Sequence, residues 1–241
     1  MTETEQGPDR SPIRIDIISD VVCPWCIIGF KQLEKAQAAT GLPVVIYWHP
    51  FELNPEMPED GQNLFEHVQD KYGSTREQSL KSREKLTALG AELGFTFDYA
   101  DDTRMVNTFR AHQLLHWAAT IDRQHQLKLA LFDAFFAERK DIDDPNILAD
   151  AADIVGLDRT EARAVLADAR FAEQVRKHET FWTSRGVDGV PTMVFDGKQA
   201  LVGAQGAENY ATMLTTVADE HVHLSQGGQA IVSAVDQGGE G

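Results

Sequence analysis

The sequence predicts an α/β fold in which a β-α-β unit at the start of the chain and an α-β-β-α unit at its end flank a long helical block. Three observations support this prediction. A β-branched strand pattern at 13–18 passes directly into a helical pattern, a second strand pattern follows at 43–48, and a strand hairpin lies at 192–202. Because strands joined through one helix pair in parallel by a right-handed crossover, the first two strands are expected side by side.

The two cysteines of the chain lie where the first strand pattern changes to a helical one. Isoleucines dominate residues 13–18, as in a buried strand. Apolar side chains then recur every three or four positions and predict a helix over 24–39, which ends at Gly41. Pro24 suits the first helical position, since its missing N–H would be unpaired there in any case. Cys23 is therefore expected to be the N-cap residue.

This position predicts a reactive thiol. A sulfur at the N-cap lies beside free backbone N–H groups and the positive end of the helix dipole, so the pKa of Cys23 is expected below its ordinary value of about 8.5. Cys26 follows one turn later on the apolar stripe, close enough to form a disulfide with Cys23. We therefore predict thiol–disulfide exchange in which Cys23 attacks and Cys26 resolves the mixed disulfide.

The alternatives for this pair are half of a zinc site, two inert thiols or a site that only binds. A structural zinc normally takes four ligands. The chain has no second cysteine pair, and its eight histidines include no convincing partner spacing. We therefore predict no metal and no cofactor.

Helical spacing dominates between the second strand and the hairpin. Asp158 followed by Glu161 is similar to a capping box at a helix start. Asp196 and Gly197 form the hairpin turn, because both residue types tolerate the positive φ angles of a tight turn. Apolar side chains at helical spacing mark further helices within 82–93, 107–118, 127–135, 161–166, 171–182 and 210–217.

Charge and hydropathy limit the classes of partner. A formal net charge of −16 argues against nucleic acid and anionic membrane surfaces, since both require basic patches. No apolar run reaches the length of about 18 residues that a membrane span needs. Residues 1–12 are polar and acidic and contain no signal-peptide core. A cytoplasmic protein is expected, and in a reducing cytosol a CxxC pair favours catalysis over a structural disulfide.

The element order, with CxxC at the first strand-to-helix junction, resembles the thioredoxin fold, and a helical insertion after the second strand resembles the DsbA family. Four segments are similar to the FrnE-like branch of that family: SDVVCPWC at 19–26, WHPFELNP at 48–55, NTFRAH at 107–112 and GVDGVPT at 186–192. The resemblance covers about residues 12–220. One departure is the absence of a further cysteine pair near the C-terminus, which excludes a relay to a second disulfide.

The resemblance implies a thioredoxin-like α/β domain with a large inserted α-helical domain. The expected domains are a disordered leader at 1–12, a thioredoxin-like domain from 13–60 and 184–222, a helical insertion at 61–183 and a flexible tail at 223–241.

The resemblance also implies the residues of a substrate site. A cis-proline is expected at Pro191, beside the CxxC pair, where the Val190 backbone would be free to pair with an extended substrate. Pro24 and Trp25, between the cysteines, are expected to be exposed and to contact substrate.

The resulting prediction is a cytoplasmic dithiol–disulfide oxidoreductase or isomerase. Its expected partners are protein or small-molecule thiols and disulfides, with glutathione as a candidate. The oligomeric state stays open. One alternative is a glutathione-dependent isomerase or transferase of the hydroxychromene carboxylate or kappa type, although that type has serine at the position of Cys23. Another alternative is a non-enzymatic accessory binder or chaperone that uses the groove between the domains.

Several other side chains have a functional and a structural interpretation. His49 and His112 could shuttle protons or contact glutathione, but packed or solvated histidines are the preferred interpretation. Asp16 and Asp20 are candidates for assisting proton transfer from Cys26. A phenylalanine cluster is expected in the helical core: Phe132, Phe135 and Phe136.

Overall fold

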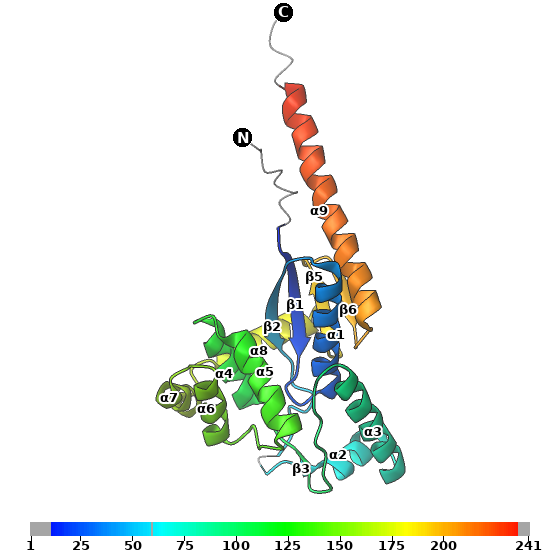
Figure 1. Cartoon of the computed structure of the whole chain (residues 1–241). Helices are drawn as coiled ribbons and strands as arrows, with labels where there is room; N and C mark the ends of the chain where they lie inside the picture. Colours follow the sequence, from blue (N-terminus) through cyan, green and yellow to red (C-terminus); the bar gives the residue numbers. More distant parts are fainter. Residues whose placement is uncertain (1–10, 59, 236–241) are drawn as a thin grey trace, which may run out of the picture.

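The computed structural model describes the backbone of residues 11–58 and 60–235, and the side chains of those up to residue 223. Most of the expected leader and the last six residues lie outside the described residues. A small sheet with two helices on one face occupies one half of the molecule, and a helical block lies beyond the end of the sheet (Figure 1). No helix in the described part combines the length and the apolar character needed to cross a bilayer.

The sheet has four strands in the order β2-β1-β5-β6, so that the first strand lies in its interior. The predicted parallel pairing of β1 and β2 is confirmed, with Ile13 opposite Val44. The predicted hairpin is also confirmed, and Asp196 and Gly197 take the positive φ angles 48° and 68°. The strands are β1 (Ile13–Ser19), β2 (Val44–Pro50), β5 (Thr192–Phe195) and β6 (Gln199–Val202).

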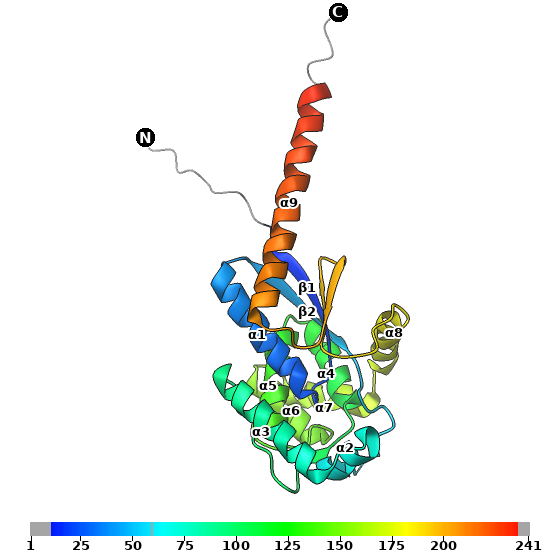
Figure 2. The same cartoon turned by 90° about the vertical axis from the view of Figure 1, so that its right-hand side faces the viewer.

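Helices α1 (Pro24–Thr40) and α9 (Ala207–Val235) pack against each other on one side of the sheet (Figures 1 and 2). As predicted, α1 begins after Cys23, and Gly41 ends it with a φ of 64°. Helix α9 continues to Val235, through most of the segment that the sequence assigned to a tail from residue 223.

The helical block contains more elements than apolar spacing predicted. Apolar spacing predicted neither helices α2 and α6 nor a two-stranded ladder. Each of the two helices begins at a polar cap: Asn63 accepts from the Phe65 N–H, and Asp144 accepts from the Asn146 N–H. The block comprises β3 (Gln62–Asn63), α2 (Leu64–Tyr72), α3 (Arg76–Glu92), β4 (Arg104–Met105), α4 (Phe109–Ala119), α5 (Gln124–Phe132), the π-helical turn η1 (Asp133–Ala137), α6 (Pro145–Ile154), α7 (Arg159–Asp168) and α8 (Ala172–Thr183).

The block forms two groups around the end of the sheet. Helices α2 and α3 lie on the side of α1, and α4 to α8 lie on the other side (Figure 1). Helices α5 and α8 both contact β2. The predicted aromatic core is confirmed, since Phe132, Phe135 and Phe136 are all buried, with ring centroids of the last two 4.8 Å apart. The junction of β1 and α1 therefore faces the helical block.

Tight packing of α3 against the following loop gives a stability test. A Cβ at Gly90 would lie 2.6 Å from Cδ2 of Phe97 and 2.8 Å from the carbonyl oxygen of Phe95. Gly90→Ala is therefore expected to lower the free energy of unfolding by about 1–3 kcal/mol, measured by urea denaturation. Gly189→Ala is the matched control, because a Cβ there meets nothing within 4 Å. Equal stabilities of the two variants would contradict this close packing.

Candidate functional site

The two cysteines occupy the first turn of α1, as expected. Cys23 has the extended φ and ψ angles of an N-cap residue, −89° and 112°, and its carbonyl accepts from the Cys26 N–H at 3.1 Å. Both thiols are free and buried, with 4% of Cys23 and none of Cys26 exposed. Trp25, by contrast, is 47% exposed. A partner molecule can therefore approach this turn at Trp25 and at the edge of Cys23.

The segment before β5 lies directly against this turn. The Val190–Pro191 bond is cis, as predicted, and the Sγ of Cys23 lies 3.7 Å from the carbonyl oxygen of Val190. Gly29 permits the close approach of Pro191 to α1, because a Cβ at Gly29 would lie 3.1 Å from the proline Cγ. The pairing of β1 with β5 brings these distant segments together.

The protonation of the pair differs from the expectation for Cys23. The pKa of Cys23 is raised well above its ordinary value, because its thiol hydrogen-bonds to Cys26 and is buried. Burial alone would raise the pKa of Cys26, but hydrogen bonds from the Cys23 and Ser19 side chains and the charge of Lys128 lower it. The two thiols therefore titrate as a pair.

The backbone of α1 is only part of the environment of Cys23. No side-chain capping hydrogen bond forms at Cys23, and its sulfur faces the Val190 carbonyl, an acceptor that favours the protonated thiol. The Ser19 hydroxyl has no other hydrogen-bond partner among the described residues and is available to Cys26. The surrounding side chains thus outweigh the helix dipole.

Lys128 is a site residue that the sequence interpretation missed. It comes from α5, is 1% exposed, and its Nζ donates to the carbonyl oxygen of Ser19 at 3.4 Å. Burial lowers its pKa to about 8, although the negative charges of Cys26 and Asp20 oppose that shift. The only signal in the sequence is a lysine set among leucines in the apolar stretch QLKLALF.

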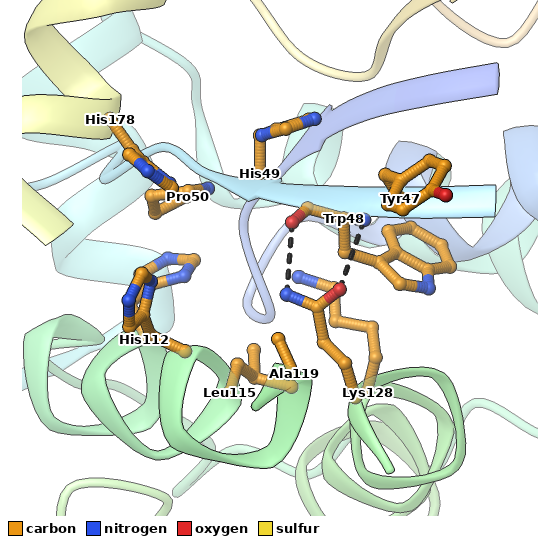
Figure 3. Close-up of a pocket in the computed structure, with 11 residues that line it drawn as sticks. Tyr47, Trp48, His49, Pro50, His112, Leu115, Ala119, Lys128 and His178 are labelled. Atoms are coloured by element: carbon orange, nitrogen blue, oxygen red, sulfur yellow. Dashed lines mark hydrogen bonds between the residues drawn. The ribbon is translucent and has the colours of Figure 1, made fainter. Parts of the chain in front are cut away.

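Helix α5 is held against β2 at the level of Lys128. The side-chain amide of Gln124, one turn earlier, bonds to both backbone groups of Trp48: its Nε2 donates to the carbonyl at 3.0 Å, and its Oε1 accepts from the N–H at 3.3 Å. Figure 3 shows these two bonds and the side chain of Lys128 rising from α5 toward the strand. The pocket drawn there is lined by Lys128 but by neither cysteine.

The two aspartate–histidine candidates occupy different places. Asp20 is fully buried, its Oδ2 accepts from the Leu53 N–H at 2.8 Å, and its Oδ1 lies 3.4 Å from Nε2 of His112. Burial would raise its pKa, but His112, the Leu53 N–H and the charge of Lys128 lower it. The charge of this carboxylate acts on Cys23. Asp20 is therefore part of the thiol environment.

Asp16 and His49 form a separate pair. Asp16 Oδ1 lies 2.7 Å from Nε2 of His49, and Arg14 donates to both oxygens of the same carboxylate. Burial opposes ionisation, but these bonds lower the pKa of Asp16 to about 2. The pockets that His49 lines contain neither cysteine. Asp16 and His49 therefore do not form part of the thiol pocket.

A pocket opens beside Cys23, between α1 and the pair α2 and α3. Its lining includes Cys23, Pro24, Trp25 and Val190, four of the six predicted site residues; Pro191 is buried next to Val190, and Cys26 lies behind Cys23. The helical side contributes an apolar group, Leu64, Val68, Leu86 and Met105, and a polar group, His67, Tyr72, Ser79, Ser82, Arg83 and Tyr99. Within the described residues, no cluster of three acidic, histidine or cysteine side chains is arranged to hold a metal.

Comparison with known proteins agrees with this geometry. Residues 14–215 match the family described as the DSBA-like thioredoxin domain. An uncharacterized protein of Bacillus subtilis, YwbO, is 27% identical over 199 residues, which span 81% of this chain and 92% of that protein.

Solved structures give the same result for the fold. A probable DsbA oxidoreductase from Streptomyces coelicolor is 36% identical, with a TM-score of 0.80 over 85% of this chain and 89% of that one. The cytosolic disulfide reductase DsbM of Pseudomonas aeruginosa, solved with GSH, is 18% identical, with a TM-score of 0.56 over 84% of this chain and 98% of that one. A 2-hydroxychromene-2-carboxylate isomerase is 15% identical, with a TM-score of 0.64 over 88% of this chain.

Proposed function

The chain belongs to the family of DsbA-like thioredoxin domains, and from this premise we propose that it is a thiol–disulfide oxidoreductase or isomerase that works through Cys23 and Cys26. The observation that carries the proposal is the pair itself: two free thiols in the first turn of α1, beside the Val190 carbonyl and at the edge of a pocket. In this proposal Pro24, Trp25 and Val190 contact the substrate, and buried Pro191 positions Val190.

The proposed reaction transfers two electrons from the protein to a substrate disulfide. Cys23 lines the pocket and Cys26 does not, so Cys23 as the thiolate attacks one substrate sulfur. The substrate S–S bond breaks, one substrate thiolate leaves, and a mixed disulfide forms. Cys26 then attacks the Cys23 sulfur, the second substrate thiolate leaves, and the protein becomes a disulfide. The two thiol protons pass to the released thiolates, and the reverse sequence oxidises substrate thiols.

The groups around Cys26 suit both directions of this exchange. When a substrate thiol attacks the oxidised protein at Cys23, Cys26 is the leaving group, and a thiol of lowered pKa leaves faster. In the reducing direction, the Cys23 thiol must lose its proton before it can attack. Lys128, with a pKa of about 8, can hold or release a proton near neutral pH and is the proposed buried acid and base.

The wider organisation follows from this reaction. We propose that 13–60 and 184–222 form the catalytic domain and that the insertion at 61–183 supplies the far wall of the substrate pocket. Thiol or disulfide compounds are the proposed partners, with glutathione as a candidate reductant, as supported by the likeness to a cytosolic reductase solved with GSH. On the same basis we propose a cytoplasmic location.

The test is the reduction of insulin disulfides by dithiothreitol with and without catalytic amounts of the protein. The proposal expects faster insulin precipitation with the wild-type protein than with dithiothreitol alone, and reversible conversion of the two thiols into an intramolecular disulfide, seen by mass spectrometry. A folded protein that forms this disulfide but does not accelerate precipitation would instead favour a glutathione-dependent or binding role. An assay for conjugation of glutathione to an electrophile would then distinguish these two roles: catalysed conjugation indicates a glutathione-dependent enzyme, and its absence indicates a binding protein.

A further inference from the structure

The pocket beside Cys23 is lined by a positive charge, although the protein as a whole is strongly acidic. The chain carries 38 acidic and 22 basic residues. Yet no aspartate or glutamate occurs among the described residues that line this pocket, and Arg83 is the one arginine or lysine among them. The pocket is therefore a locally positive place on an acidic protein, directly next to the sulfur that we propose as the nucleophile.

Arg83 is buried without an ionic partner. Only 8% of the residue is exposed, and its Nε and Nη2 have no hydrogen-bond acceptor among the described residues. Its guanidinium instead stacks on the ring of Phe65, with the Cζ 3.5 Å from the ring centroid. A buried arginine normally has its N–H donors satisfied, because desolvation without an acceptor is costly.

The neighbouring groups compensate this charge only in part: burial lowers the pKa of Arg83, and the opposing influence of Tyr99 and Asp101 does not cancel that shift. Tyr99, whose ring centroid is 5.7 Å from the guanidinium carbon, is held in its neutral form because burial raises its pKa well above the ordinary range. Arg76 stacks on Phe65 as well, at 4.0 Å, but its Nη2 is paired with Asp101 at 3.1 Å. The two arginines thus share one ring, and of the two Arg76 is the one in an ion pair with Asp101.

We propose that Arg83 binds a carboxylate of the substrate, so that the disulfides and thiols exchanged at Cys23 are carboxylate-bearing molecules. The Nε–H and Nη2–H groups form one edge of the guanidinium, and a carboxylate is the group whose two oxygens match such an edge. The apolar wall of the pocket receives the body of the substrate, and Ser79 and Ser82 line the same space. This inference rests on the proposed exchange reaction.

The test compares two small disulfides that differ in charge. Dithiodipropionate ends in carboxylates, whereas hydroxyethyl disulfide is of similar size and neutral. The reduced wild-type protein is mixed with each, quenched with acid, and the rate of oxidation is measured by mass spectrometry. In Arg83→Met, which keeps the length of the side chain, the ratio of the dithiodipropionate rate to the hydroxyethyl disulfide rate is expected to fall about tenfold. Arg83→Lys, which keeps the charge, is expected to recover part of the ratio.

Lys81→Met is the matched control, because it removes the same charge from the same helix at an exposed position outside the pocket, where Lys81 pairs with Glu77. Its ratio is expected to equal that of the wild type. A wild-type ratio in Arg83→Met, in a variant that circular dichroism shows to be folded, overturns the inference and leaves the proposed function standing. If the wild-type protein reacts with neither disulfide faster than free cysteine does, the proposed function and this inference fall together.

Discussion

Cys23→Ser is expected to reduce the catalysis of insulin reduction by at least about a thousandfold, because it removes the sulfur that forms the mixed disulfide. Cys23 is the thiol that lines the pocket, and the sulfur of Cys26 lies fully buried behind it. A remaining thiol at Cys26 therefore has no path to a protein disulfide. Residual activity of Cys23→Ser within tenfold of the wild type would show that Cys23 is not the attacking thiol.

Cys26→Ser is the paired variant and should behave differently. Attack by Cys23 can still occur, but nothing resolves the product, so a mixed disulfide accumulates. After exposure to oxidised glutathione, mass spectrometry is expected to find glutathione attached at Cys23. The wild-type protein under the same conditions should show mainly the intramolecular disulfide. An unmodified Cys23 in the folded Cys26→Ser variant would contradict the proposed order of attack and resolution.

Lys128→Met is expected to raise the first pKa of the thiol pair by about one unit. The positive charge of Lys128 lowers the pKa of Cys26, so its loss makes the thiolate less stable. Because the reduced protein contains that thiolate, its stability relative to the disulfide falls by about 1.4 kcal/mol, which corresponds to a reduction potential more negative by about 30 mV. Ultraviolet thiolate absorbance against pH measures the first quantity, and equilibration with glutathione measures the second.

The control for this variant is Lys31→Met. Lys31 also carries a positive charge, but its ammonium pairs with Glu34 on the surface of α1 at 2.8 Å. This variant makes the same change in net charge and is expected to keep the wild-type titration curve and potential. If Lys128→Met is folded and keeps the wild-type titration curve, the buried ammonium does not control the pKa of the thiol pair. The lowered pKa of Cys26 would then need another cause.

Local chemistry allowed the sequence alone to predict most of the catalytic half of the fold. Pro24 after Cys23 marks a helix start, Gly41 marks its end, and Asp196 with Gly197 marks a hairpin; each signal depends on the dihedral angles of one or two residues. The cysteines and the segment before β5 could therefore be placed on their elements, and the resemblance to the DsbA family brought them together. Apolar spacing did not predict helices α2 and α6. Their starts are marked by a polar cap at Asn63 for α2, and by a polar cap at Asp144 followed by Pro145 for α6.

Only the tertiary structure decided the electrostatics of the site. Lys128 lies 109 residues from Ser19 in the chain, and its bond to the Ser19 carbonyl, from which its charge acts on Cys26, depends on α5 packing against β2. Burial opposes ionisation of Cys26, but the hydrogen bonds from Cys23 and Ser19, with the charge of Lys128, lower the pKa of Cys26, whereas the helix dipole predicted a lowered pKa at Cys23. Arg83 likewise joins Cys23 in one pocket only because α3 lies beside α1. Burial and through-space charge set both properties, and neither depends on distance along the chain.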